Sequence, residues 1–313
     1  MIRKFQALLQ NIAWLLRSGG LRRHLVEQQD RFEKFEARIV SLCEPIPFLA
    51  RRARSHGWVY GHHMALDPDD TVVSPRLCVE GSFEHLETEL VLNEVRAGDI
   101  VVDVGANIGY YTLLFARRVG PAGHVYAFEP DPRNFSLLKR NVLQNGYDNV
   151  TCVPCAVSER SGSLRLFRND GNRGDHRIYD SHDGRQVIET ACLALDDFFA
   201  DVARPVNFIK MDIQGAEARA WRGMQRLIAN SAPNLRIVTE FWPRGLTLCG
   251  DDPRQFLNQL LALGFDVDVI DEATHRILPA DPESLLLRLP VEPDHDLLFT
   301  NLLCRRRPIA QVA

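Results

Sequence analysis

Residues 100–109, Ile-Val-Val-Asp-Val-Gly-Ala-Asn-Ile-Gly, decide the fold of this chain. Apart from Asp103, the first five residues are apolar, which is typical of a strand buried on both faces of a parallel sheet. Glycines at 105 and 109 then mark a tight turn, and residues 108–118 follow with the apolar spacing of a helix. A strand that runs through a glycine turn into a helix predicts an open α/β sheet with a ligand site at that turn.

Strand-like and helix-like segments alternate on both sides of this turn, and a polar, glycine-rich loop interrupts them at residues 169–186. This alternation predicts a mainly parallel sheet that helices cover on both faces. We expect strands at Trp58–Leu66, Thr71–Ser74, Ile100–Gly105, His124–Phe128, Val150–Val157, Leu164–Phe167, Val187–Leu193, Asn207–Ile213, Leu235–Phe241, Val267–Ile270 and Asp296–Leu303. We expect helices at Leu86–Glu94, Ile108–Arg118, Arg133–Asn145, Leu195–Asp201, Ala216–Ala229 and Pro253–Leu263.

The length of 313 residues fits one large domain with an appendage. We expect an amino-terminal helical appendage at 1–55, a strand-pair lead-in at 56–88 and the main α/β domain at 89–313. Within the appendage, residues 1–42 show apolar positions at helical and heptad spacing. These helices are expected to pack on their own protein. Self-association and contact with a membrane surface are the alternatives.

The composition argues against several classes of protein. The chain has 37 Lys and Arg residues and 41 Asp and Glu residues, and the resulting net charge of −4 argues against a nucleic-acid binder. We find no run of 18 apolar residues that would predict a transmembrane helix. The seven cysteines have scattered spacing, which is typical of reduced thiols in a cytoplasmic protein. Cys152 and Cys155 form the one Cys-x-x-Cys pair, and a zinc site needs more ligands, so we expect no metal.

The glycine pattern narrows the choice of ligand. A dinucleotide fingerprint needs glycines at relative positions 1, 3 and 6, but this turn has Gly105, Asn107 and Tyr110 there. The Gly-Lys-Ser/Thr ending of a phosphate-binding loop is also missing. Asp103 places a carboxylate beside the turn, which disfavours a phosphate and suits a cation. Glu129 ends the next strand and suits a ribose diol. S-adenosylmethionine carries a sulfonium, an ammonium and a ribose but no phosphate, so it is the expected cofactor.

Three segments, the first of which contains this turn, make the pattern specific. They are Asp103–Thr112 (DVGANIGYYT), Ala127–Pro130 (AFEP) and Phe208–Glu217 (FIKMDIQGAE), preceded by Gly81-Ser-Phe-Glu84 and accompanied by Leu195-Asp-Asp-Phe198. Together they resemble the FkbM family of S-adenosylmethionine-dependent methyltransferases over residues 57–305. One departure is Gln214, where that family often has glutamate, and this puts any metal-binding role of the position in doubt.

The resemblance implies a Rossmann-like class I methyltransferase fold, with a seven-stranded, mainly parallel sheet whose last strand is antiparallel. It also implies O-methylation of sugars, polyketides or related small molecules, so the expected partner is a small-molecule or glycan acceptor. The residues that we place at the cofactor are Glu84, Asp103, Gly105, Asn107, Gly109, Glu129 and Ala156, the last through its backbone beside the adenine.

Methyl transfer to a hydroxyl needs alignment of the reactants and removal of a proton. Asp212 ends a predicted strand and is our first candidate for the base. Glu240 ends the next strand and is the second. Lys210 lies two residues before Asp212, on the same strand face, and is expected to pair with it. His176 in the polar loop is a candidate that would act from a lid.

Two other functions remain open at this point. A nucleotide-cofactor oxidoreductase would use the same sheet, although Asn107 and Tyr110 argue against it. A non-catalytic docking protein that retains the fold would use its amino-terminal residues. Methylation of nucleic acid is disfavoured by the acidic charge balance and by the missing Asp/Asn-Pro-Pro-Tyr/Phe motif. We expect a cytoplasmic location, with peripheral membrane contact as the alternative.

Overall fold

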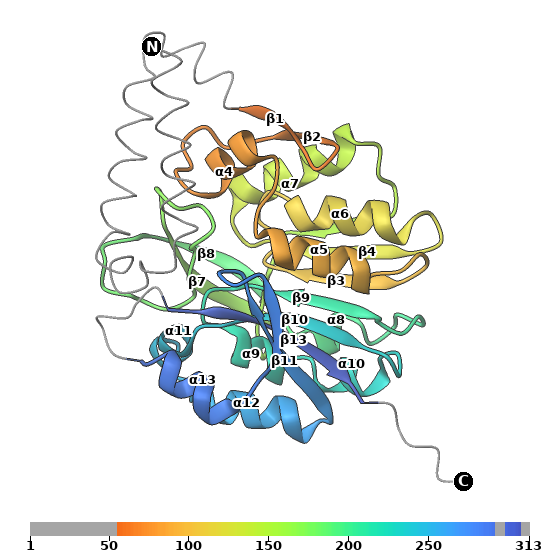
Figure 1. Ribbon diagram of the computed structural model, residues 1–313. Helices are drawn as coiled ribbons and strands as arrows, with labels where there is room; N and C mark the ends of the chain where they lie inside the picture. The colour runs from red at the N-terminus through yellow and green to blue at the C-terminus, as the bar shows by residue number, and fades with distance from the viewer. Residues whose placement is uncertain (1–54, 292–297, 308–313) are drawn as a thin grey trace, which may run out of the picture. The chain divides into compact units, whose positions relative to one another are not determined.

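Figure 1 shows the computed structural model of the chain, in which residues 55–291 and 298–307 are described. The chain divides into two units, residues 1–51 and 52–313, and the described residues belong to the second. The predicted helices of residues 1–42 and the start of the predicted strand Asp296–Leu303 therefore lie outside the described residues. In the part of the chain that is described, no helix is long and apolar enough to cross a membrane.

Eight strands form the main sheet, and the strand that opened the sequence analysis, β3, lies inside it. The strands from β10 to β5 pair in parallel, whereas β13 is antiparallel to both of its neighbours. The predicted mainly parallel sheet with an antiparallel last strand is thus confirmed. An eighth strand, β12, which the sequence did not predict, is added at the edge. The order is β12 (Arg276–Pro279), β11 (Phe265–Asp271), β13 (Thr300–Arg306), β10 (Arg236–Phe241), β9 (Phe208–Met211), β3 (Ile100–Val104), β4 (His124–Phe128) and β5 (Val150–Val153).

Helices cover both faces of this sheet, as the alternation of the sequence predicted (Figure 1). Successive residues of β3 point to opposite faces, so Val101 joins one hydrophobic core and Val102 joins the other. Asp103 lies two residues after Val101, so its side chain points to the same face of the sheet, toward α6. The helices on that side are α5 (His85–Glu94), α6 (Tyr110–Val119) and α7 (Pro132–Gln144), and those on the other include α8 (Leu195–Phe198), α9 (Glu217–Arg222), α10 (Gln225–Asn230), α12 (Pro253–Ala262) and α13 (Pro282–Arg288).

The predicted strand Val150–Val157 divides into two strands in different sheets. β5 ends at Val153, and β6 (Ala156–Val157) joins β8 (Gln186–Leu193) and β7 (Gly162–Arg168) in a three-stranded sheet. Pro154 lies at the break, where it has no N–H to donate to a ladder. The break turns the chain away from the main sheet beside the end of β4.

The lead-in differs from the predicted pair of strands. β1 (His56–Val59) and β2 (His62–Ala65) form a hairpin in place of the single predicted strand Trp58–Leu66, because Tyr60 and Gly61 both adopt positive φ. The predicted strand Thr71–Ser74 is wrong, since α4 (Val73–Glu80) begins there. The Asp70 carboxylate accepts N–H groups of Val72 and Ser74 and turns the chain into that helix.

Other differences lie in the carboxyl-terminal half. The predicted helix Ala216–Ala229 is two short helices, because the chain passes so close to Ser158 that a Cβ at Gly223 would overlap its carbonyl oxygen. The sequence analysis also missed α13 and α11 (Pro243–Leu248), which begin at prolines that suit a first helical turn.

Candidate active site

The turn between β3 and α6 lies against the end of β9. Gly105 has a φ of 82°, and a Cβ there would overlap the carbonyl oxygen of Asp212. Gly109 has a φ of 92° and packs against Leu138 of α7. Asn107 also adopts a positive φ, of 51°, which asparagine tolerates better than most residues. The glycines of the sequence pattern are therefore required by backbone conformation and by close packing.

Glu129 is fixed to this turn by backbone groups. Its Oε2 accepts the N–H of Asn107 at 2.9 Å, and its Oε1 accepts the N–H of Asp131 at 2.9 Å. The side chain is only 4% exposed, and burial raises the pKa of its carboxyl to about 8. Lone pairs of both oxygens remain available for further donors, which is the arrangement that a diol requires.

A pocket opens where the carboxyl ends of the parallel strands meet. Its lining includes Gly105, Asn107 and Glu129 from the first two strand ends, Ala156 from β6, Asp212 after β9 and His176 from the polar loop. This position, beside the first strand, is where ligands bind in open α/β sheets. The structure thus brings together four of the seven residues that the sequence assigned to a cofactor.

The other three cofactor candidates do not line this pocket. Asp103 lies behind the turn, where its Oδ2 accepts the hydroxyl of Thr112 at 2.6 Å and burial raises its pKa to about 6. Gly109 contacts α7. Glu84 precedes α5 and accepts hydrogen bonds from Tyr111 at 3.0 Å and Asn301 at 3.3 Å.

Lys210 stands at the centre of a second group of polar residues. Its Nζ lies 3.4 Å from Glu87 Oε1, 3.6 Å from Asp212 Oδ2 and 4.3 Å from the centre of the Tyr111 ring. Burial alone would lower the pKa of this lysine, but the charges of Glu87, Asp212 and Glu84 outweigh it and raise the pKa above its ordinary value. Lys210 is therefore a buried ammonium, as its predicted pairing with Asp212 requires.

Asp212 and Glu240 are joined by the side chain of Gln214. Its Nε2 donates to Asp212 Oδ1 at 2.8 Å and contacts Glu240 Oε1 at 3.4 Å. Glu240 is buried, and burial, followed by the charge of Asp212, raises its pKa well above the ordinary value. The Asp212 side chain is 31% exposed and reaches the pocket. Of the two predicted bases, Asp212 is thus the one that reaches the pocket, and Glu240 lies buried beside it.

His176 lies apart from this acid and lysine group. Its Nδ1 accepts the N–H of Asn169 at 3.1 Å, and its Nε2 faces Asp131 Oδ2 at 3.8 Å. The side chain is 7% exposed, and burial lowers its pKa. Its packing around residues 169–176 therefore differs from that of a surface loop histidine, and it borders the pocket on the side of α7.

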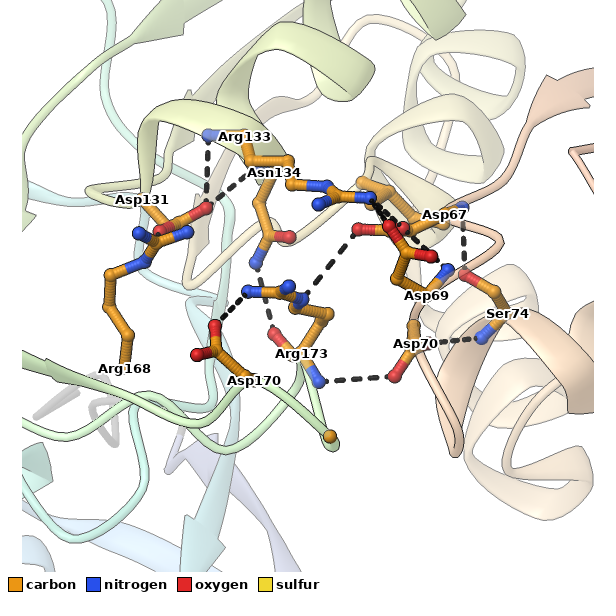
Figure 2. Close-up of polar contacts among 12 residues, drawn as sticks. Asp67, Asp69, Asp70, Ser74, Asp131, Arg133, Asn134, Arg168, Asp170 and Arg173 are labelled. Carbon is orange, nitrogen blue, oxygen red and sulfur yellow. Dashed lines mark hydrogen bonds and ion pairs between the residues drawn. The ribbon is translucent and has the colours of Figure 1, made fainter. Parts of the chain in front are cut away.

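Figure 2 shows the polar contacts that tie this loop to the lead-in and to α7. The carbonyl oxygen of Arg173 accepts side-chain amides of Asn107 at 3.2 Å and Asn134 at 3.0 Å, and its N–H donates to Asp70 at 3.1 Å. Its guanidinium lies 3.7 Å from Asp67 and 2.9 Å from Asp170. These contacts draw the loop over one side of the pocket.

Sequence reasoning missed Arg173, Asn134 and Glu87. The first two act through backbone and amide contacts that leave no pattern in the chain. Glu87 did leave a signal, because it lies three and four residues before the buried Leu90 and Val91. Helical spacing alone would therefore have placed a carboxylate on the buried face of α5.

The fold and the pocket define an α/β protein with a candidate ligand site at the carboxyl end of β3. The chain belongs to the FkbM methyltransferase family, because the FkbM methyltransferase domain matches residues 103–267. That match includes the glycine turn, Glu129, the acid and lysine group of β9 and the end of β10.

Individual relatives agree with this placement. The 31-O-demethyl-FK506 methyltransferase FkbM of Streptomyces tacrolimicus is 30% identical over 162 residues, covering 42% of this chain and 62% of that protein. The hexuronic acid methyltransferase AglP of Haloferax volcanii is 28% identical over 138 residues, covering 43% and 54%. The chain spans about six tenths of the length of such relatives. Among solved structures, a putative rRNA methylase of Clostridium thermocellum aligns over 71% of this chain and 95% of that chain, with 13% identity and a TM-score of 0.42.

Proposed function

We propose that the protein is an S-adenosylmethionine-dependent O-methyltransferase that acts on a hydroxyl of a sugar or glycan, a glycolipid or a secondary metabolite. The observation that carries this proposal is the pocket itself, where a diol-accepting Glu129 and a partly exposed Asp212 border one space at the strand ends. Family membership supports methyl transfer over the oxidoreductase and docking alternatives.

The residues of the pocket suit this cofactor. Glu129 would accept the ribose hydroxyls, and the apolar residues Val157, Leu166 and Ile178 would flank the adenine next to the backbone of Ala156. A bound S-adenosylmethionine supplies an electrophilic methyl group on its sulfonium. Asp103 would add negative charge behind the turn, and Glu84 and Gly109 would act by holding the neighbouring helices, which assigns them a supporting role.

Asp212 would accept a hydrogen bond from the acceptor hydroxyl and take up its proton. Its carboxylate is fixed from two sides, since Gln214 donates to one oxygen and Lys210 lies beside the other. Glu240 is buried and does not line the pocket, so it would contact the acceptor only if the Gln214 bridge opened. We keep His176 as a group that borders the cofactor and place the proton transfer on Asp212.

The charges of the site favour an uncharged acceptor. Around Asp212 lie five more carboxyl groups, and Lys210 is the one cation of this group in the described residues. An acceptor carboxylate or phosphate placed there would face like charge without a free cation to pair with. Two of the relatives are named for a hexuronic acid and for 31-O-demethyl-FK506, and this charge balance favours the hydroxyl of a neutral compound here.

The remaining predictions concern the whole chain. Residues 56–88 share a hydrophobic core with the main domain, since Val59, Met64 and Leu77 pack with α6, so we propose that the lead-in folds with residues 89–313. The appendage at 1–55, its self-association or membrane contact, and the cytoplasmic location stay predictions.

Two measurements test the proposed function. Calorimetric titration is expected to show binding of S-adenosylmethionine and none of NAD, and the reverse result would overturn the cofactor assignment. Release of S-adenosylhomocysteine is then followed with the methyl glycosides of glucose, galactose, mannose and fucose and with methyl glucuronide. We expect turnover with a neutral glycoside. A faster reaction of the glucuronide than of the glucoside would contradict the uncharged acceptor.

A further inference from the structure

Glu87 is a carboxylate in an unusually closed environment. It lies in the first turn of α5, whose Leu86 and Glu87 N–H groups are capped by Glu272 at 3.1 and 2.7 Å. Its side chain is fully buried, and neither of its oxygens has a hydrogen-bond partner within the described chain. A buried carboxylate is unfavourable unless a counter-charge is present, so the position of Glu87 depends on a nearby cation.

The counter-charge is Lys210, and it is shared. The ammonium lies 3.4 Å from Glu87 and 3.6 Å from Asp212, so the two carboxylates compete for it. The Tyr111 ring lies 4.3 Å from the same Nζ and limits its movement. One of the two carboxylates is sealed in the protein, and the other opens into the pocket.

We propose that Glu87 is a positioning residue of the methyl-transfer site. It holds the Lys210 ammonium between itself and Asp212. The Asp212 carboxylate is thereby oriented toward the pocket without forming a full ion pair, which would make it a weaker base. The proposal rests on the proposed function. An ammonium that belonged to Asp212 alone would stabilise its ionised form and make it a weaker base. A buried partner that takes part of the charge prevents this.

Other groups face the same ammonium and must be counted in any pH response. From the start of α5 come Glu84 and Glu87, and the remaining elements contribute Asp103 of β3, Tyr111 of α6, Asp212 after β9 and Glu240 of β10. Glu217 of α9 interacts with Asp212. The described residues contain no group of three or more His, Cys, Asp or Glu side chains that could hold a metal ion.

The test compares Glu87→Gln with Glu89→Gln, which removes an exposed carboxylate from the same helix. With the acceptor that the glycoside panel identifies, we expect Glu87→Gln to move the acid limb of the kcat profile at least half a pH unit lower and to reduce the plateau about three- to tenfold. Glu89→Gln should leave both unchanged, and Glu87→Asp should restore part of the plateau. Binding of S-adenosylmethionine should stay within twofold, because Glu87 does not line its pocket.

An unchanged acid limb in Glu87→Gln, or one that moves to higher pH, would overturn the positioning role. A second measurement does not depend on any acceptor. Urea unfolding of Glu87→Gln, Lys210→Met and the double variant should show that Lys210→Met lowers the unfolding midpoint less when Glu87→Gln is already present than in the native chain. Additive losses would also overturn the proposal. If no acceptor on the panel reacts, the glycoside part of the proposed function fails, while the unfolding measurements still decide whether Glu87 and Lys210 act as a pair.

Discussion

The two halves of the site are built in different ways. The proposed cofactor half comes mainly from residues 103–134, which are close in sequence, together with Ala156 of β6, and its Glu129 carboxylate is held by backbone N–H groups. The acceptor half gathers Glu87, Lys210 and Glu240 from three distant elements, and a single ammonium balances several acids. The first half depends on backbone conformation, whereas the second depends on charge balance, so they should respond differently to substitution.

The largest effect is expected at Asp212. Replacement of Asp212 by Asn keeps the shape and removes the base, so kcat should fall about 10²- to 10⁴-fold. The dissociation constant of S-adenosylmethionine should change less than threefold. Turnover and calorimetry measure the two effects, and Asp148→Asn, on an exposed turn, is the control. Full turnover of Asp212→Asn would remove Asp212 from the chemistry.

A pair of glycines tests the backbone half. Gly105 and Gly98 have nearly the same φ, 82° and 86°, but a Cβ meets the Asp212 carbonyl oxygen at the first and open space at the second. Gly98→Ala should therefore cost about 1 kcal/mol of unfolding free energy from backbone strain. Gly105→Ala should cost about 2 kcal/mol more, because overlap forces the turn away from β9. Equal losses in urea unfolding would show that close packing at Gly105 is unimportant.

Glu129 should affect the cofactor more than the chemistry. In Glu129→Gln an amide N–H₂ would face one of the two backbone N–H groups, so the dissociation constant of S-adenosylmethionine should rise about 10- to 100-fold. The maximal rate at saturating cofactor should stay within a few fold. Glu159→Gln, which removes a carboxylate that pairs with Arg222 away from the pocket, is the control in the same titration. A lower kcat with unchanged binding would contradict this division of roles.

The last prediction concerns the dependence of stability on pH. Burial raises the pKa values of Glu84, Glu129 and Glu217 to about 8, so the folded chain binds more protons than the unfolded chain between about pH 4.5 and 8. The free energy of unfolding should therefore fall as pH rises through this window, by at most about 1.4 kcal/mol per pH unit for each group.

Urea unfolding at pH 5, 6, 7 and 8 measures this slope. Glu217→Gln imitates the protonated acid and removes one titrating group, so the slope of unfolding free energy against pH should become smaller. The Ile213 N–H can still donate to the side-chain oxygen of the variant. Stability that rises with pH across the window would contradict the assignment.

The sequence predicted the residues of the proposed cofactor site more completely than those of the proposed acceptor site. Gly105, Asn107, Glu129 and Ala156 line one pocket because strand ends of a parallel sheet meet at one edge. Asp103 and Gly109 belong to the same pattern, but they lie behind the turn. The Asp103 side chain points toward α6, and Gly109 packs against α7. His176 was expected in a lid, and the structure buries it beside Asp131.

The sequence by itself determined the parallel sheet, the glycine turn, Glu129 and the Lys210–Asp212 pair, because strand and helix periodicities and short loops are local properties of the chain. Only the tertiary structure decided that Glu87 shares Lys210, that Gln214 joins Asp212 to Glu240, and that Arg173 fastens the polar loop to Asn107 and Asn134. Most of these contacts join residues that lie far apart in the chain, as Glu87 and Lys210 do, and local patterning carries no information about such pairings.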